Sequence, residues 1–327
     1  MPPVSEGSVR VALPPDVFKR LSRLNRELVL DRLTTGDRVS APGAGESRPG
    51  ERPGAESVPP ESVTLETLIP GRELTLPHGR VYHIRRPAVE FRGGVAGAGE
   101  DEPLAGGADL INRYTRVFFG AGRVAAPDDL HESLRPVVLA GPERVTYLDI
   151  ESCGLAGEMV FLVGLMRYAG GTLQVDQFLA RDYSEERAML AVVRDELAAG
   201  ECLVTFNGKA FDVPSIQSRC IASGFFDPLP VRAHVDLLHE SRRRWKKELP
   251  NCRLQTLEQM VCGRHRVGDI PGSEIPAAYH DFVRAHREGD ARRRARTVRT
   301  LQVILHHNAL DLVTMADLIV HILAGEG

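Results

Sequence analysis

The segment Arg144–Leu155, RVTYLDIESCGL, decides the fold of this chain, because a β-rich run ends there in two acidic residues, Asp149 and Glu151. Two more β-rich runs follow it, MVFLVGLM at 159–166 and LQVDQFLA at 173–180, and turn-like residues separate the three. Short β-rich runs joined by turns predict an antiparallel meander over these residues.

The residues after the meander predict alternating helix and strand. Residues 184–200, SEERAMLAVVRDELAAG, predict a helix with Ser184 as its N-cap and Gly200 as its stop. A strand at 202–206, a helix entered through Pro214 and a long final helix from about 296 to 323 follow. This order is typical of an α/β domain of the ribonuclease H-like kind, a mixed sheet flanked by helices, which we expect over residues 144–325.

The residues ahead of this domain predict a smaller, partly disordered N-terminal region. Residues 1–36 contain apolar side chains at helical spacing and predict an amphipathic helical segment, and residues 37–62, rich in Gly, Pro, Ser and Glu, predict a flexible linker. Residues 63–140 predict a small β-containing region, with short strands near 65–69, 73–76 and 80–84.

The composition excludes several classes of protein. With 43% hydrophobic and 26% charged residues, the 327-residue chain is typical of a globular protein. It has no run of about 18 apolar residues and no signal pattern, so we expect no membrane segment and a cytoplasmic location. Residues 242–299 hold 15 Lys and Arg against 7 Asp and Glu, a local excess that favours a nucleic acid as partner.

Three acidic motifs follow one another along the predicted domain. Asp149 and Glu151 lie two apart on a strand, so both side chains point to one face, where they can share a cation. The second motif is NGKAFD, residues 207–212, between a strand and a helix, and the third is HHNALD, residues 306–311, in the last helix. Carboxylates gathered at a sheet edge are the ligands that a hard divalent ion prefers.

In this order and spacing, the motifs D-x-E, N-x-x-x-F-D and H-x-x-(x)-x-D resemble the signature of the DEDD superfamily of 3′→5′ exonucleases. More closely, residues from about Val145 to Leu323 resemble the predicted exonuclease domain of the YprB family. That resemblance also rests on LVTFNGKAFDVP, HVDLLHESRRRWKKELPNCRLQTLE and RVGDIPGSEIP.

The resemblance implies a 3′→5′ exonuclease that hydrolyses phosphodiester bonds of single-stranded DNA or RNA. Two divalent ions, Mg²⁺ or Mn²⁺, would lie about 3.5–4 Å apart. Asp149 would bridge both ions, Glu151 and Asp311 would complete the first, and Asp212 would support the second. A histidine would take the proton of the attacking water.

Two histidines precede Asp311, and the sequence leaves open which of them is the base. His306 lies five residues before the aspartate, as in the histidine branch of the superfamily, and His307 lies four before it, as in the tyrosine branch. Residues four apart share a helix face, so a continuous helix favours His307, whereas a helix that begins after the histidines makes His306 possible.

Other residues are assigned to the substrate. In the second motif these are Asn207, Lys209 and Phe211. In the basic run 242–247, cations can pair with phosphates and an indole can stack on a base, which favours Arg243, Arg244, Trp245 and Lys246.

Two further groups have simpler explanations than a metal. Asp236, between His234 and His239, is explained by helix capping. Cys252, Cys262 and His265 lack the paired spacing of a zinc site.

Three alternatives to an exonuclease differ in what they require. A non-catalytic nucleic-acid-binding module of the same fold would lack one of the acids, and all four are present. An endonuclease of the same broad fold would use a different arrangement of acids. A protein whose N-terminal half does the biological work would reveal itself through its partners.

Overall fold

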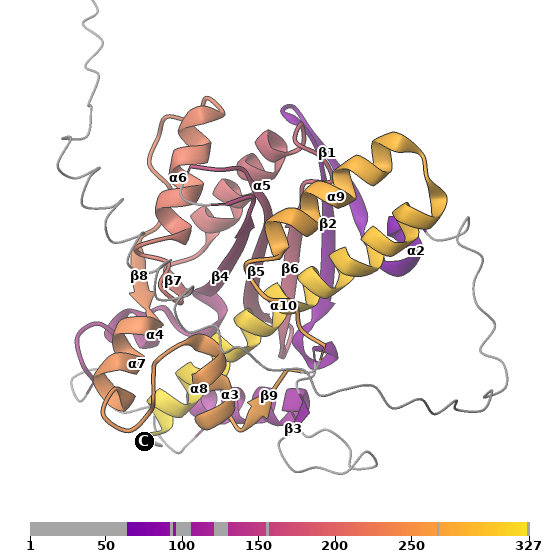
Figure 1. Ribbon diagram of the computed structural model, residues 1–327. Coiled ribbons are helices and arrows are strands. Elements are labelled where there is room, and N and C mark those ends of the chain that lie inside the picture. Colours follow the sequence, from indigo (N-terminus) through magenta and orange to yellow (C-terminus); the bar gives the residue numbers. More distant parts are fainter. Residues whose placement is uncertain are drawn as a thin grey trace, which may run out of the picture. The chain divides into compact units, whose positions relative to one another are not determined.

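The structure is a computed structural model, and it describes residues 64–91, 94–95, 106–120, 130–154, 157–266 and 268–325 (Figure 1). All of them belong to the second of two compact units, Ser57–Gly327. The helical segment expected within residues 1–36 and the linker expected at 37–62 lie outside the described residues.

A seven-stranded mixed sheet forms the centre of this unit, in the order β1-β2-β6-β5-β4-β7-β8. The neighbouring strands β1, β2, β6, β5 and β4 pair antiparallel, and β4, β7 and β8 run parallel. The antiparallel pairing of β4, β5 and β6 confirms the predicted meander. The strands are β1 (Arg72–Leu76), β2 (Gly79–Pro87), β4 (Val145–Ser152), β5 (Val160–Ala169), β6 (Thr172–Leu179), β7 (Cys202–Thr205) and β8 (Ala233–Asp236). The predicted ribonuclease H-like mixed sheet is confirmed.

The region expected at 63–140 is not a separate β-containing unit. Its strand β2 pairs with β6 along Tyr82–Pro87, so β1 and β2 extend the sheet of the main domain. The strand expected at 65–69 is instead helix α2 (Leu65–Leu68), because the side chains of Thr64 and Thr67 each cap the other's backbone N–H. Pairing between segments so far apart in the sequence leaves no local signal.

Helices cover both faces of the sheet. Figure 1 shows the last helix α10 crossing one face beside α9, with α5 on the opposite face. The helices are α3 (Gly106–Phe119), α4 (Arg135–Ala140), α5 (Glu186–Ala199), α6 (Asp212–Ala222), α7 (Leu237–Trp245), α8 (Leu254–Met260), α9 (Ile275–Glu288) and α10 (Ala291–Ala324), with 3₁₀ turns at Ala88–Glu90 and Pro142–Arg144. A two-stranded ladder joins β3 (Gly94–Val95) to β9 (Arg264–His265).

Two predicted helix boundaries change. Ser184 is not the N-cap of α5, because its hydroxyl donates to Asp182 Oδ1 at 2.5 Å and the helix begins at Glu186. The final helix starts at Ala291, where the Asp290 carboxylate accepts from the backbone N–H groups of Arg292 and Arg293. This longer α10 is apolar enough to span a membrane by length and composition, yet 83% of its most apolar window is buried, as in a core helix.

Candidate active site

Four acidic side chains converge from three elements near the carboxyl end of the interior strand β4. Asp149 and Glu151 lie on β4, Asp212 is the first residue of α6, and Asp311 lies on α10. The negative charges of the other three acids all raise the pKa of Asp149. The fold therefore brings the four carboxylates close enough to interact as one centre. The structure therefore brings together all four residues that the sequence motifs predicted.

Burial and mutual repulsion raise the pKa values of three of these acids, Asp149, Glu151 and Asp212. Burial, then the charges of Asp311, Glu151 and Asp212, raise the pKa of Asp149 well above its usual range. Burial raises the pKa of Glu151 to about 8, although the charge of His307 opposes the shift. Burial also raises the pKa of Asp212 to about 7. A cation bound among these carboxylates would relieve the cost of ionising them.

A chain of buried amides holds Asp149, and the sequence reading missed it. Gln177 Nε2 donates to Asn308 Oδ1 at 2.8 Å, and Asn308 Nδ2 donates to Asp149 Oδ2 at 2.8 Å. Gly164 pairs with Asp149 across the sheet, and a Cβ on Gly164 would collide with Asn308 Oδ1. The absence of a side chain at Gly164 therefore leaves room for the amide that orients Asp149.

The continuity of helix α10 bears on the choice between the two histidines. The helix is continuous from Ala291 to Ala324, so His307 lies beside Asp311, with His307 Nε2 at 3.7 Å from Asp311 Oδ2. The ring of His306 points elsewhere, with its centroid 5.9 Å from that of Phe91, and burial lowers the pKa of His306. The geometry expected for a continuous helix is confirmed, and it favours His307.

A buried arginine, which the sequence reading also missed, borders the acids. Arg266 Nε lies 2.7 Å from Glu258 Oε2, and its other nitrogens pair with Asp269 at 3.3 Å and with Asp311. Asp269 Oδ1 in turn lies 2.7 Å from His307 Nδ1. Arg266 and Asp269 belong to the segment RVGDIPG, whose position beside the acids only the fold reveals.

The turn that leads to Asp212 is held by Asp236. Its carboxylate accepts from the backbone N–H groups of Asn207 at 2.8 Å and Lys209 at 3.1 Å, and it also caps α7 through Leu238 N–H at 3.1 Å. The predicted capping role of Asp236 is confirmed. Asn207 has a φ of 64°, the left-handed conformation that Asn tolerates better than most residues. Asp236 thus shapes the loop that contains Asn207 and the exposed Lys209. Phe211, the residue before Asp212, is partly buried against the hydrophobic core.

Comparison with known proteins agrees with this geometry. The family model of the RNase_H superfamily matches residues 146–323, more than half of the chain. The chain belongs to the RNase H superfamily. Its segment of 179 residues is 34% identical to the uncharacterized protein YprB of Bacillus subtilis (strain 168), and covers 54% of this chain and 41% of that protein. The chain therefore spans less than half the length of this relative.

Among solved structures, the family B DNA polymerase of the archaeon Pyrobaculum calidifontis is similar over 55% of this chain and 27% of the polymerase, with a TM-score of 0.36 and 17% identity. Membership of the RNase H superfamily suggests a nuclease that binds nucleic acid.

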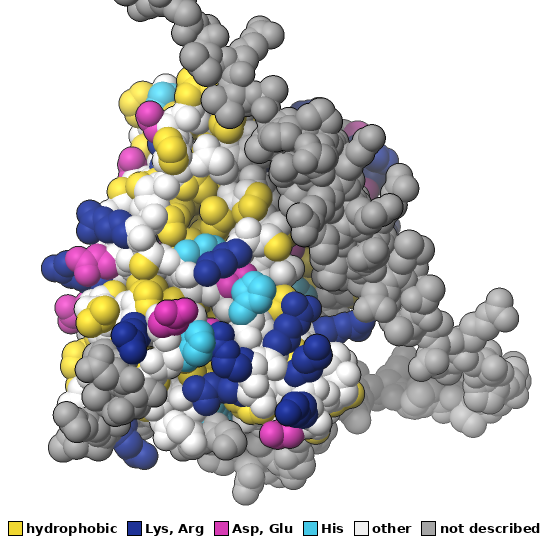
Figure 2. All heavy atoms as spheres, turned by 90° about the vertical axis from the view of Figure 1, so that its left-hand side faces the viewer, with side chains coloured by type: hydrophobic (Ala, Val, Ile, Leu, Met, Phe, Trp, Pro, Cys, Tyr) yellow, Lys and Arg dark blue, Asp and Glu magenta, His cyan; other side chains and the backbone are white. Residues whose placement is uncertain are grey.

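The basic run of this RNase H superfamily member lies on α7 and just beyond it. Arg243, Lys246 and Lys247 are exposed, and Arg244 is half-buried. Arg243 Nη1 also pairs with Glu240 at 2.8 Å, which offsets part of its charge. Lys and Arg side chains gather on the face of the molecule that carries α7 (Figure 2). The run thus presents cations at the surface, as predicted.

The side chain of Trp245 is buried, so it is not presented for stacking on a base. It is 5% exposed and packs in the hydrophobic core with Leu237 and Leu257. Leu237, Ser241 and Trp245 recur every four residues, so they form the buried face of α7. The stacking role predicted for Trp245 is corrected to one in core packing.

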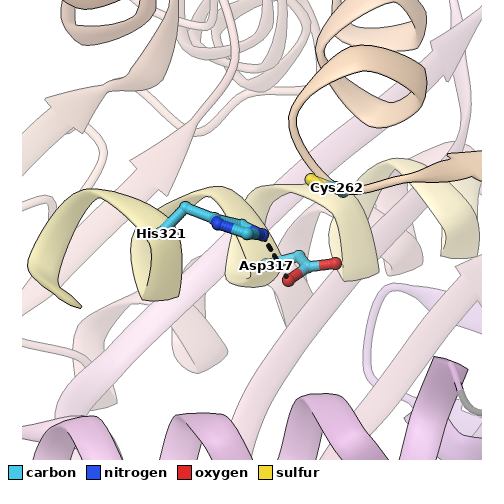
Figure 3. Close-up of side chains that lie close together, drawn as sticks. All are labelled: Cys262, Asp317 and His321. Carbon is cyan, nitrogen blue, oxygen red and sulfur yellow. Dashed lines mark ion pairs between the residues drawn. The ribbon is translucent and has the colours of Figure 1, made fainter. Parts of the chain in front are cut away.

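A second group of potential metal ligands lies near the end of α10, where Cys262, Asp317 and His321 have ligand atoms within 4.8 Å of one another (Figure 3). Asp317 already pairs with Arg113 Nη2 at 2.7 Å and with Arg264 Nε at 3.3 Å. Burial raises the pKa of the Cys262 thiol, which must lose its proton to bind a metal. Two guanidinium groups at the carboxylate disfavour a further cation here.

Proposed function

We propose that the chain is a metal-dependent 3′→5′ exonuclease that hydrolyses phosphodiester bonds of single-stranded nucleic acid. The observation that carries the proposal is the convergence of Asp149, Glu151, Asp212 and Asp311, with His307 at 3.7 Å from Asp311. Asp212 is 5% exposed and the other three acids are half-buried, so ionising all four together costs free energy unless cations accompany them. A structural role alone gives no reason to gather four of them.

The donor set fits two divalent cations such as Mg²⁺ or Mn²⁺, because all four side chains offer hard carboxylate oxygens. Arg266 pairs with Oδ1 of Asp311, which leaves Oδ2 for a cation. Such ions, when bound, lower the pKa of water and stabilise the leaving 3′ oxygen. By resemblance, Asp149 would serve both ions, Glu151 and Asp311 would hold the first, and Asp212 would hold the second. The amide of Asn308 orients the shared carboxylate.

His307 is the general base in this proposal. Its Nε2 accepts the proton of the attacking water, the new P–O bond forms, and the bond to the 3′ oxygen breaks. The ring is largely buried, and Asp269 holds it by a hydrogen bond at Nδ1, so Nε2 faces the acids. His306 has no contact with the acid centre among its described contacts, and it serves no proton transfer here.

The substrate strand approaches along the basic surface of α7. The cations of Arg243, Arg244 and Lys246 pair with phosphates there, and the contact is independent of base identity. Lys209 stands exposed three residues before Asp212, where it meets a phosphate near the scissile bond. Asn207 and Phe211 complete the substrate side of the same turn.

The test is a degradation assay on single-stranded DNA and RNA oligonucleotides labelled at the 5′ end, with Mg²⁺, Mn²⁺ or EDTA. We expect a ladder of products shortened stepwise from the 3′ end, which EDTA abolishes. Asp149→Asn and Asp311→Asn remove charge with little change in shape and should abolish it too. A matched control is Asp195→Asn, since Asp195 is exposed on α5, on the opposite face of the sheet.

Other outcomes would separate the alternatives. Binding of the oligonucleotides without cleavage, under all metal conditions, would favour a non-catalytic nucleic-acid-binding module. Internal cuts on a circular single strand would indicate an endonuclease. Full activity in Asp149→Asn would contradict the proposed centre itself.

A further inference from the structure

The two ring nitrogens of His307 face different carboxylates. Nδ1 lies 2.7 Å from Asp269 Oδ1, whereas Nε2 lies 3.7 Å from Asp311 Oδ2 on the side of the acid centre. The first distance is a hydrogen bond and the second is not. Asp269 therefore holds the His307 ring through Nδ1, whereas no hydrogen bond from Asp311 occupies Nε2.

The proton of the neutral ring belongs on Nδ1. Arg266 Nη1 also approaches Nδ1, at 3.4 Å, and as a donor it would require that nitrogen to be unprotonated. The Asp269 contact is 0.7 Å shorter, and an ionised carboxylate can only accept. The carboxylate contact therefore determines the tautomer, which leaves the lone pair of Nε2 directed toward the acids.

Asp269 is itself fixed on several sides. Its carboxylate accepts from the backbone N–H of Ile270 at 3.0 Å and from Arg266 Nη1 at 3.3 Å. Gln255 Nε2 lies at 3.4 Å from the same carboxylate. Arg266 is anchored in turn by Glu258, a residue only 1% exposed. A carboxylate held by this many donors keeps one orientation and so imposes one on the imidazole.

We propose that Asp269 is the positioning residue of His307: it holds the proton on Nδ1 and aims the free Nε2 at the water to be deprotonated. The inference rests on the exonuclease activity proposed above and deepens it. After proton transfer both ring nitrogens carry hydrogen, and the charge of Asp269 stabilises the imidazolium until the proton leaves for solvent. Asp269 touches neither substrate nor metal in this scheme.

The test has a readout that is independent of catalysis. In the full chain labelled with ¹⁵N-histidine, long-range ¹⁵N–¹H correlation spectra distinguish Nδ1–H from Nε2–H for each ring, and His307→Ala assigns the signal. We expect wild-type His307 to carry its proton on Nδ1 and Asp269→Ala to populate Nε2–H. Asp269→Glu, which restores an acceptor, should return part of the Nδ1–H signal. An unchanged tautomer in Asp269→Ala would overturn the proposal.

Kinetics on the 5′-labelled strand provide the second arm. Asp269→Ala should lower kcat roughly 10- to 100-fold with little change in KM, by analogy with the carboxylates that orient metal-bound histidines. In a His307→Ala background the same substitution should have no further effect, because the residue it positions is gone. Asp195→Ala, at an exposed site on α5, is the matched control. A full additive loss in the double variant would show that Asp269 acts otherwise, as would lost Mn²⁺ binding.

The two arms also separate this inference from the proposed function. If the wild-type protein degrades no nucleic acid, the exonuclease proposal fails, while the tautomer measurement still decides whether Asp269 orients His307. If Asp269→Ala unfolds, Asp269→Leu, which has a similar branched shape but no acceptor, takes its place in both arms. The thermal unfolding midpoint of each variant shows which case applies.

Discussion

Asn308 Nδ2 donates a hydrogen bond of 2.8 Å to Asp149 Oδ2, and a second of 3.2 Å to the backbone carbonyl of the same residue. One buried amide thus fixes both the strand and the carboxylate that the proposed mechanism shares between two ions. Asn308 is itself fixed by Gln177, so the orientation of Asp149 depends on two residues on different elements.

We therefore expect Asn308→Ala to impair catalysis, because Asn308 orients the carboxylate of Asp149. The change frees Asp149 to rotate and leaves the Gln177 amide with one bond fewer in a buried site, which costs about 1–3 kcal/mol of stability. A roughly 10- to 100-fold loss of kcat should accompany it. Rates and unfolding midpoints measured beside Gln302→Ala, an exposed amide of the same helix, check this. Equal rates in the two variants would contradict it.

Gly164 offers a second test of the same arrangement. A methyl group there would collide with Asn308 Oδ1 and would approach Leu312 Cδ1 to 2.9 Å. Gly164→Ala should destabilise the protein by about 1–3 kcal/mol, as overpacking does, and displace the amide from Asp149. Gly272→Ala is the matched control, since nothing lies within 4 Å of its added carbon. Chemical denaturation of both variants should separate them, and similar midpoints would count against this packing.

The sequence predicted those parts of the site that local patterns encode. Asp149 and Glu151 end a strand, and Asp212 and Asp311 sit in recognisable helix motifs, so each acid carries its own signal. Asp269 and Gln177 carry none, because their partners His307 and Asn308 lie 38 and 131 residues away. Such contacts arise only when the fold brings α10 against the sheet.

The error at Trp245 has a different cause. Because its neighbours are basic, the whole run was expected to be exposed. Trp245 instead shares the buried face of α7 with Leu237 and Ser241. Helical spacing would have separated the apolar face from the charged one before the structure was known. The place of β1 and β2 in the main sheet had no comparable signal, because the pairing of β2 with β6 joins residues such as His83 and Phe178 across the chain.

The raised pKa values predict how stability depends on pH. Glu151 and Asp212 have ordinary pKa values of 4.5 and 3.8, and burial raises these pKa values to about 8 and about 7 in the folded protein. The folded state thus binds more protons than the unfolded state between about pH 4 and pH 8. Without divalent ions, the free energy of unfolding should therefore fall as the pH rises through this window.

Divalent ions should counteract that trend. Because they compete with protons for the same carboxylates, Mg²⁺ should raise the unfolding midpoint more at pH 8 than at pH 6. Glu151→Gln should weaken both the pH dependence in EDTA and the stabilisation by Mg²⁺, whereas Glu143→Gln, at an exposed site, should change neither. Scanning calorimetry at the two pH values measures this, and a flat profile in EDTA would argue against buried, ionisable acids.

The basic surface of α7 should determine affinity for the strand rather than the rate of cleavage. Lys246 and Lys247 are exposed, so reversing both charges should weaken binding of a single-stranded oligonucleotide roughly tenfold and flatten its dependence on salt. Anisotropy titrations at several salt concentrations, in an Asp149→Asn background that prevents cleavage, measure both quantities. Arg292→Glu with Arg299→Glu, two exposed arginines near the start of α10, is the matched control with the same change of charge. An equal loss in both double variants would mean that the strand senses only net charge, and that α7 is not its docking surface.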